Sequence, residues 1–243
     1  GSEMCIRDRV YDAEQTSDST LVLTMHSPAG DNNFPGNVTA TVTYTLTADN
    51  KLDIAYAATT DAPTVINMTN HAYFCLSGDP EATVADDVLQ INAAAYTPVD
   101  STYMTTGEIL LVAGTPMDFT EPKPVGRDYT AFDFEQIKNG NGFDHNWVLA
   151  TEGDITLPAA SLTSPASGIT LTVYTDEPGI QFYSGNFLDG SITGKMGKKY
   201  VQHAGLCLET QHYPDSPNKP HWPSTMLRPG EKYESHTIFA FSN

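Results

Sequence analysis

Apolar and polar residues alternate along most of the chain with a period of two, which places successive side chains on opposite faces of a β-strand. Residues 37–47 are a clear case, because valine, alanine, tyrosine and leucine alternate there with threonine. Asp49 and Asn50 follow with side chains that favour tight turns, and the alternation resumes over residues 51–59. This pattern predicts an antiparallel hairpin.

Similar runs recur to the end of the chain, and they predict a protein built almost entirely of strands. The further predicted strands are residues 64–70, 88–96, 145–150, 168–176, 180–185, 205–210 and 236–241. Residues 130–140 alone resemble a short helix, with Asn139 and Gly140 as its stop signal. Because 18 glycines and 16 prolines punctuate the strands, we expect an all-β fold, a large antiparallel β-sandwich. We expect one domain over residues 1–243 and interpret residues 1–9 as a non-native start.

The net charge of the chain argues against two classes of binding partner. The chain has 30 acidic and 12 basic residues, a formal charge of −18, so nucleic acid and anionic membrane surfaces would be repelled. No apolar run reaches the ~18 residues that a transmembrane helix needs. The first residues contain no apolar segment typical of a signal peptide, which favours the cytoplasm. Cys5, Cys75 and Cys207 form no CxxC pair and no even disulfide framework.

Four stretches place polar residues where strands are expected to begin or end. His71 follows Asn70 in residues 67–78, Asp144 lies in 141–149, Gln181 in 178–190, and Glu209 follows the apolar residues 205–208. Each residue alone is explained by a surface or turn position. Together they supply a base, an acid and hydrogen-bonding groups beside aromatic residues, an inventory typical of a sugar site. A carboxylate withdrawn from water, as expected for Glu209, has a raised pKa suited to a base.

The same four stretches resemble the signature segments of a known family. "TNHAYFCLSG", "NGFDHNWVL", "PGIQFYSGNFLDG" and "GLCLETQHYPDSPNKPHWPSTMLRPGEKY" are similar, in this order, to segments of the aldose 1-epimerases (galactose mutarotases). The resemblance covers the chain from about residue 37 to its end. It implies the β-sandwich of the galactose mutarotase-like superfamily and the interconversion of α and β anomers of free aldoses such as galactose and glucose.

The resemblance also implies a role for each residue. Glu209 would be the catalytic base and His71 the acid, while Asp144, Gln181 and Asn70 would bind sugar hydroxyls. Histidine, as a residue type, titrates near neutral pH and can act as such an acid. Proton transfer alone opens and closes the sugar ring, so we expect no cofactor and no metal. The expected partner is a small-molecule aldose, and the oligomeric state stays open.

One part of the family pattern is not found. The resemblance implies an N-terminal portion before the strand that starts near Leu21, with an arginine in a Gly-Arg…Asn-Arg segment and a histidine in a Leu-His-Gly-Gly segment. Neither segment occurs in the chain. We therefore expect the chain to lack this portion and to be a weak or inactive mutarotase by itself.

Three other interpretations stay open at this point. A hexose-phosphate mutarotase of the same superfamily would need cationic residues at its site, and Arg228 lies within a signature segment. A carbohydrate-binding module would keep the aromatic residues without needing both Glu209 and His71. A metal-dependent enzyme would use histidines, but the spacing of His203, His212 and His221 matches no compact ligand motif.

Overall fold

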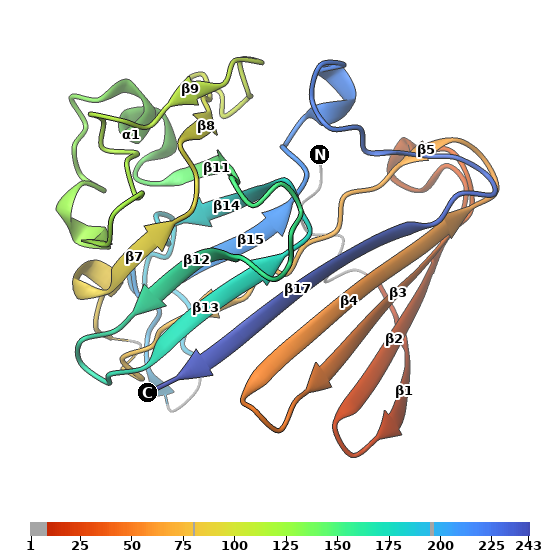
Figure 1. Cartoon of the computed structure of the whole chain (residues 1–243), viewed down its shortest axis with the longest axis horizontal. Helices are drawn as coiled ribbons and strands as arrows, with labels where there is room; N and C mark the ends of the chain where they lie inside the picture. The colour runs from red at the N-terminus through yellow and green to blue at the C-terminus, as the bar shows by residue number, and fades with distance from the viewer. Residues whose placement is uncertain (1–8, 80, 195–196) are drawn as a thin grey trace.

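The computed structural model describes residues 9–79, 81–194 and 197–243 and shows two large antiparallel sheets (Figure 1). The nine-stranded sheet contains, in spatial order, β1 (Asp12–Ser17), β2 (Thr20–Ser27), β3 (Val38–Leu46), β4 (Lys51–Thr60), β17 (Tyr233–Ser242), β13 (Thr170–Thr175), β12 (Pro158–Thr163), β7 (Val88–Ile91) and β10 (Lys123–Pro124). The six-stranded sheet contains β6 (Tyr73–Phe74), β15 (Leu206–Gln211), β14 (Gly179–Tyr183), β11 (Asp144–Val148), β8 (Ala95–Thr97) and β9 (Leu110–Leu111). The predicted antiparallel β-sandwich is confirmed.

Small elements complete the fold. A two-stranded sheet pairs β5 (Thr64–Val65) with β16 (Met226–Leu227), and one α-helix, α1, spans Glu135–Gly140. Short 3₁₀ turns occur at η2 (Asp31–Asn33), η3 (Val84–Asp86), η4 (Val125–Arg127) and η6 (Ser216–Asn218). In the described residues, no helix has the length and apolar character needed to cross a membrane.

The main core lies between the six-stranded sheet and the β13–β12–β7 part of the nine-stranded sheet. Alternate residues of β14 and β15 point into it, among them Phe182 and Leu208, and β13 contributes Leu171 from the other side. Trp147 and Phe182 are completely buried there, with their ring centroids 5.8 Å apart. Burying large side chains of this kind contributes about 1.5–3 kcal/mol each, so this core holds the two sheets together.

The strands β1 to β3 form a wing on one side of the molecule, away from β7, β8 and β9 (Figure 1). Neither β1 nor β2 contains a buried residue, whereas in β3 only Ala40 and Val42 are buried. A small second cluster joins Ala40 to Ala58 and Leu227. The wing is therefore held mainly by backbone pairing with β4.

The predicted hairpin is confirmed as β3 and β4, which pair from Val38–Thr60 to Leu46–Leu52. Asn50 has φ +61°, the left-handed conformation that asparagine tolerates in turns. The predicted strand over residues 88–96 is wrong as one element. Its first part is β7 of the nine-stranded sheet and its last part β8 of the six-stranded sheet, and the chain crosses between the layers at Asn92–Ala94. An apolar run buried on both sides gives no periodicity signal for such a crossing.

Other predicted elements differ in length. Strand pairing in residues 64–70 is limited to β5, because the Met68 backbone N–H bonds the Tyr233 hydroxyl and Asn67 bonds the His212 backbone through its side chain. The helix expected over residues 130–140 starts only at Glu135, since Phe134 is extended and Ala131 closes a turn on Asp128. The sequence pattern also missed β12, whose small polar residues carry little strand signal.

The expected non-native start falls on residues 1–9, of which residues 1–8 lie outside the described part. Arg9 is described and forms an ion pair with Asp31 of η2.

Candidate active site

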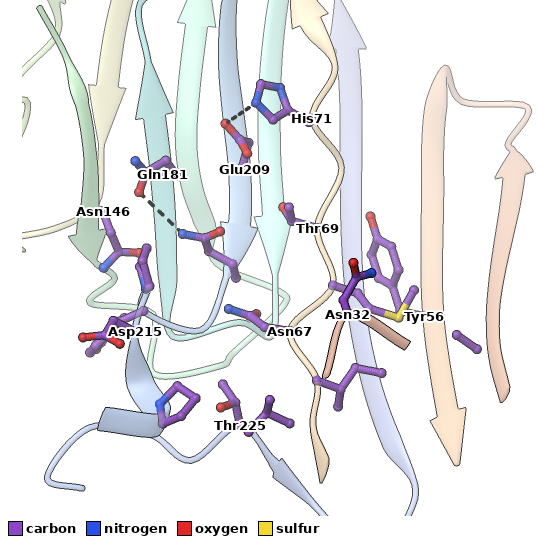
Figure 2. Close-up of a pocket in the computed structure, with 18 of the residues that line it drawn as sticks. Asn32, Tyr56, Asn67, Thr69, His71, Asn146, Gln181, Glu209, Asp215 and Thr225 are labelled. Atoms are coloured by element: carbon purple, nitrogen blue, oxygen red, sulfur yellow. Dashed lines mark hydrogen bonds and ion pairs between the residues drawn. The ribbon is translucent and has the colours of Figure 1, made fainter. Parts of the chain in front are cut away.

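A cleft of about 1200 Å³ lies against the face of the six-stranded sheet that points away from the core. Asp144, Gln181 and Glu209 line it from the sheet, and His71 lines it from the coil that precedes β6. The opposite side is formed by the wing, where Leu23 and Met25 of β2 line it. Figure 2 shows His71, Glu209 and Gln181 converging in one part of this cleft.

Strand alternation explains why polar side chains gather on this face. In β15, Leu206 and Leu208 belong to the core, so Cys207, Glu209 and Gln211 point the other way. The antiparallel register then sets Glu209 opposite Gln181. The same register sets Gln181 opposite Asn146 of β11, so the site spans three neighbouring strands.

The expected acid and base lie next to each other. His71 Nε2 is 3.7 Å from Glu209 Oε1, although the two residues lie far apart in the sequence. The Glu209 side chain is 9 % exposed and that of His71 is 42 % exposed. One partner is therefore held in a largely water-excluded strand, while the other reaches into the cleft from a more open coil.

A second neighbour orients the His71 ring. Cys207 Sγ lies 3.4 Å from His71 Nδ1, so the ring is held between a thiol on one nitrogen and a carboxylate on the other. Burial raises the pKa of the Cys207 thiol far above its usual range, with the Glu209 and Asp144 carboxylates adding to the effect. At neutral pH the thiol is therefore protonated.

The coil that carries His71 is tied to the sheets by side chains. Asn67 donates from Nδ2 to the His212 carbonyl (2.9 Å) and accepts from the His212 backbone N–H (3.0 Å). The Met68 backbone N–H donates to the Tyr233 hydroxyl, and that hydroxyl donates to buried Glu177. His212 Nδ1 lies 2.6 Å from the other Glu177 oxygen. This network positions the His71 coil against the end of β15.

A chain of hydrogen bonds orders the predicted sugar-binding residues. Gln181 Nε2 donates to Asp144 Oδ1 at 2.8 Å, and Gln211 Nε2 approaches Gln181 Oε1 at 3.5 Å. Since the amide of Gln181 is fixed by both contacts, its position relative to Asp144 is set before a ligand enters. The sequence interpretation missed Gln211. Its spacing of two residues from Glu209 on one strand was the signal that could have found it.

Aromatic rings border the acid–base pair. The His71 ring lies 5.4 Å from Tyr73 and 6.3 Å from Tyr183, and the ring of Phe187 stacks 6.4 Å from Tyr183. Burial raises the pKa of both the Tyr73 and the Tyr183 hydroxyl, and nearby carboxylates contribute. These phenols are therefore neutral, and their faces offer an apolar surface of the kind that packs against the C–H groups of a sugar ring.

Two other residues from the polar stretches have different surroundings. Asn70 is not among the described residues that line the cleft. Its Oδ1 accepts from the Ala72 backbone N–H at 3.1 Å, and its Nδ2 lies 3.4 Å from the Tyr44 hydroxyl. His145 is completely buried, and desolvation lowers its pKa to about 3, so it is a neutral core residue.

The hexose-phosphate and metal-dependent interpretations depend on Arg228 and on three histidines. These residues do not lie beside His71 and Glu209. Arg228 is not among the described residues that line the cleft, and its side chain is 62 % exposed beside Glu231. His203 bonds the Ser184 carbonyl, His212 bonds Glu177, and His221 bonds the Gly107 carbonyl. Within the described part of the chain, these three histidines form no common metal-binding cluster.

Comparisons with known proteins agree with the geometry. The family model "Aldose 1-epimerase" matches residues 5–240. Galactose mutarotase from Homo sapiens is 43 % identical over 216 residues, which cover 89 % of this chain and 61 % of the relative. Aldose 1-epimerase from Escherichia coli is 41 % identical over 227 residues, covering 93 % of this chain and 64 % of the relative. The chain thus spans about three fifths of the length of these relatives.

Solved structures show the same fold. An aldose epimerase homologue from C. elegans superposes with a TM-score of 0.86 at 30 % identity, covering 96 % of this chain and 68 % of that one. Galactose 1-epimerase from Lactobacillus acidophilus superposes with a TM-score of 0.80 at 29 % identity, covering 96 % and 66 %. From the family match over most of its length and from these relatives, the chain belongs to the aldose 1-epimerase family.

Proposed function

We propose that this protein is an aldose 1-epimerase, which interconverts the α and β anomers of free aldoses such as galactose and glucose. The observation that carries the proposal is the placement of Glu209 and His71. The buried Glu209 carboxylate lies 3.7 Å from an imidazole nitrogen of His71. The hydrogen-bonded pair of Gln181 and Asp144 lies next to Glu209, since Gln181 is its partner on the neighbouring strand. The names of the human and Escherichia coli relatives support the same activity.

The geometry fits the proton transfers that ring opening requires. The anomeric hydroxyl oxygen and the ring oxygen are both bonded to C1, so the base and the acid must lie close together. Ionised Glu209 takes the proton of the anomeric hydroxyl, the bond between C1 and the ring oxygen breaks, and protonated His71 gives its proton to the ring oxygen. An open-chain aldehyde results, with a neutral Glu209 and a neutral His71.

Reclosure reverses these steps on the other carbonyl face. Rotation about the C1–C2 bond turns the aldehyde over, and the former ring oxygen attacks C1 while His71 takes back its proton. Glu209 returns its proton to the carbonyl oxygen, which becomes the hydroxyl of the opposite anomer. Both side chains end in their starting states, so the cycle consumes nothing. Each proton transfer is expected to supply about 10²–10⁴-fold in rate.

The polar and aromatic neighbours support binding of the sugar. Asp144 and Gln181 are expected to hydrogen-bond ring hydroxyls, with Gln211 holding the Gln181 amide in place. Tyr73 and Tyr183 give an apolar wall beside His71. Asn70 stays a predicted contributor to this side of the site through its place next to His71 in the chain. We propose small-molecule aldoses as the partners.

The test follows the optical rotation of freshly dissolved α-D-galactose and α-D-glucose. It uses the 243-residue chain and, in parallel, a fusion that adds the part of the human relative that the match does not cover. We expect faster decay of the rotation than in buffer, and we expect Glu209→Gln to reduce the catalysed rate by about 10²–10⁴-fold. The matched control is Glu234→Gln, an exposed glutamate on strand β17 outside the cleft, which should leave the rate unchanged.

Two results would contradict the proposal. If neither the chain nor the fusion accelerates anomerisation, the activity is wrong, and sugar binding measured by NMR would then indicate a binding module. If Glu209→Gln retains most of the rate while Glu234→Gln behaves like the unmodified protein, Glu209 is not the base. His71→Asn tests the acid in the same assay and should lower the rate to a similar extent.

A further inference from the structure

His71, Cys207 and Glu209 form a compact group of three metal-ligating side chains. One ligand atom of each, an imidazole nitrogen, the thiol sulfur and a carboxylate oxygen, lies within 4.8 Å of the other two. Of the described residues, these are the three that form such a group of histidine, cysteine and carboxylate ligands. Two of the contacts are short. Cys207 Sγ lies 3.4 Å from His71 Nδ1, and Glu209 Oε1 lies 3.7 Å from His71 Nε2.

The two short contacts go to different nitrogens of the His71 ring, so one nitrogen must turn toward both other ligands to complete a zinc site. Bonds of about 2.0–2.3 Å to nitrogen, oxygen and sulfur in tetrahedral geometry place neighbouring ligand atoms about 3.3–3.6 Å apart. Cys207 and Glu209 are two residues apart on β15, so both project from the same face of a paired strand. The His71 side chain is 42 % exposed and belongs to a coil, so the ring can turn one nitrogen toward the other two ligands.

The local charge favours a cation at this point. The Glu209 carboxylate belongs to this group, and the Asp144 carboxylate lines the same cleft. A divalent cation would be attracted by the same two carboxylates. On binding, the thiol loses its proton to solvent and the sulfur forms a bond to the metal, so no oxidant or reductant is involved.

The donor set selects the kind of metal. Thiolate and imidazole are the ligands of zinc and other thiophilic ions, whereas magnesium and calcium are held by oxygen atoms. Three protein ligands leave the fourth tetrahedral position for water or a sugar hydroxyl.

We propose that His71, Cys207 and Glu209 bind one Zn²⁺ or a similar thiophilic divalent cation, and that the bound cation inhibits the enzyme. The inhibitory part rests on the proposed function, because a cation on Glu209 and His71 removes both the base and the acid. The binding part does not rest on it. Zinc binding can therefore be measured whether or not the chain is active.

The binding test uses the full chain without a histidine tag. Isothermal titration with ZnCl₂ should show one site, and titration with CoCl₂ should give the near-ultraviolet charge-transfer band of a thiolate-bound cobalt ion. Cys207→Ser should weaken zinc binding by at least about tenfold and abolish that band, because the thiolate is the softest of the three ligands. The matched control is Cys75→Ser, whose thiol lies near Ser77 and the Asp79 carbonyl, and it should change neither result.

The proposal is overturned if the chain shows no saturable zinc binding, or if Cys207→Ser binds zinc as tightly as the unmodified chain. Should Cys207→Ser fail to fold, the cobalt spectrum of the unmodified chain decides, since a spectrum without the thiolate band rules out Cys207 as a ligand. The inhibitory part of the proposal is tested separately, in the anomerisation assay. Zinc should stop anomerisation and EDTA should restore it. Zinc binding by a chain and fusion that never accelerate anomerisation would overturn only the proposed function.

Discussion

The two walls of the cleft differ in what stands behind them. The six-stranded sheet is backed by the main core, with Phe182 and Leu208 fully buried on the face opposite Gln181 and Glu209. In the described part of the chain the wing has no comparable layer, and β1 and β2 contain no buried residue. Strand β3 of the wing nevertheless alternates apolar residues with threonine. Precise placement of the polar side chains therefore depends on the opposing layer, and the wall with that layer is the wall that carries the acid and the base.

The largest expected effect compares one leucine from each region of the nine-stranded sheet. Leu171 of β13 is fully buried, whereas Leu23 of β2 is only partly buried in the wing. Leu171→Ala should lower the free energy of unfolding by about 2–5 kcal/mol, because it leaves a cavity in a close-packed core. Leu23→Ala should cost less than about 1 kcal/mol. Urea denaturation of both variants measures the difference, and equal losses would mean that the wing is packed as tightly as the core.

The second effect concerns acid stability and involves His145 in β11. Burial lowers its pKa in the folded state to about 3, below the ~6.5 of an unfolded histidine. Above pH 6.5 both states are neutral at this residue and it makes no contribution. Between pH 6.5 and 3 only the unfolded state takes up the proton, so the free energy of unfolding should fall by about 1.4 kcal/mol per pH unit.

This effect is measured by urea denaturation between pH 7 and pH 4.5. His145→Asn should flatten the decline while keeping an acceptor for the Asp144 backbone N–H. His26→Gln, an exposed histidine of the wing, is the control and should keep the full slope. A slope that His145→Asn leaves unchanged would show that other groups dominate acid unfolding.

The third effect compares two aspartates that line the cleft from opposite walls. Asp144 bonds Gln181 on the six-stranded sheet, whereas Asp31 lies in η2 beside the wing and pairs with Arg9. Asp144→Ala should lower kcat/KM for aldoses by about 10- to 150-fold, the equivalent of about 1.5–3 kcal/mol for a charged hydrogen bond. Asp31→Ala should change it by less than about threefold. Polarimetric rates at several sugar concentrations provide kcat/KM, and equal effects would extend the sugar site onto the wing.

The smallest expected effect is at the open end of the wing. Leu46, the last residue of β3, is 62 % exposed. Leu46→Thr should change the free energy of unfolding by no more than about 0.5 kcal/mol, since it removes little buried surface. Val173→Thr in β13 is the contrast, because it buries a hydroxyl in the core and should cost more. A large loss for Leu46→Thr would indicate that another layer covers this end of the wing.

Much of the site was predictable because strand alternation is a local property. The spacing of Cys207, Glu209 and Gln211 by two residues places them on one face of β15, opposite Leu206 and Leu208. The signature segments pointed to Glu209, His71, Asp144 and Gln181, and the structure brings these four to one cleft. The same segments pointed to Asn70, which lies beside Tyr44 and whose role in the site stays a prediction.

The sequence by itself determined the strand-rich architecture, the β3–β4 hairpin and the family, because these depend on local periodicity, turn chemistry and contiguous motifs. Only the tertiary structure decided which distant strands pair with one another. It also decided at which residue the chain leaves one sheet and enters the other. It split residues 88–96 between the two sheets and set Glu209 opposite Gln181. It also brought His71 to Cys207 across 136 residues. Such contacts follow from the packing of two sheets on a shared core, and no local pattern encodes the register between segments so far apart.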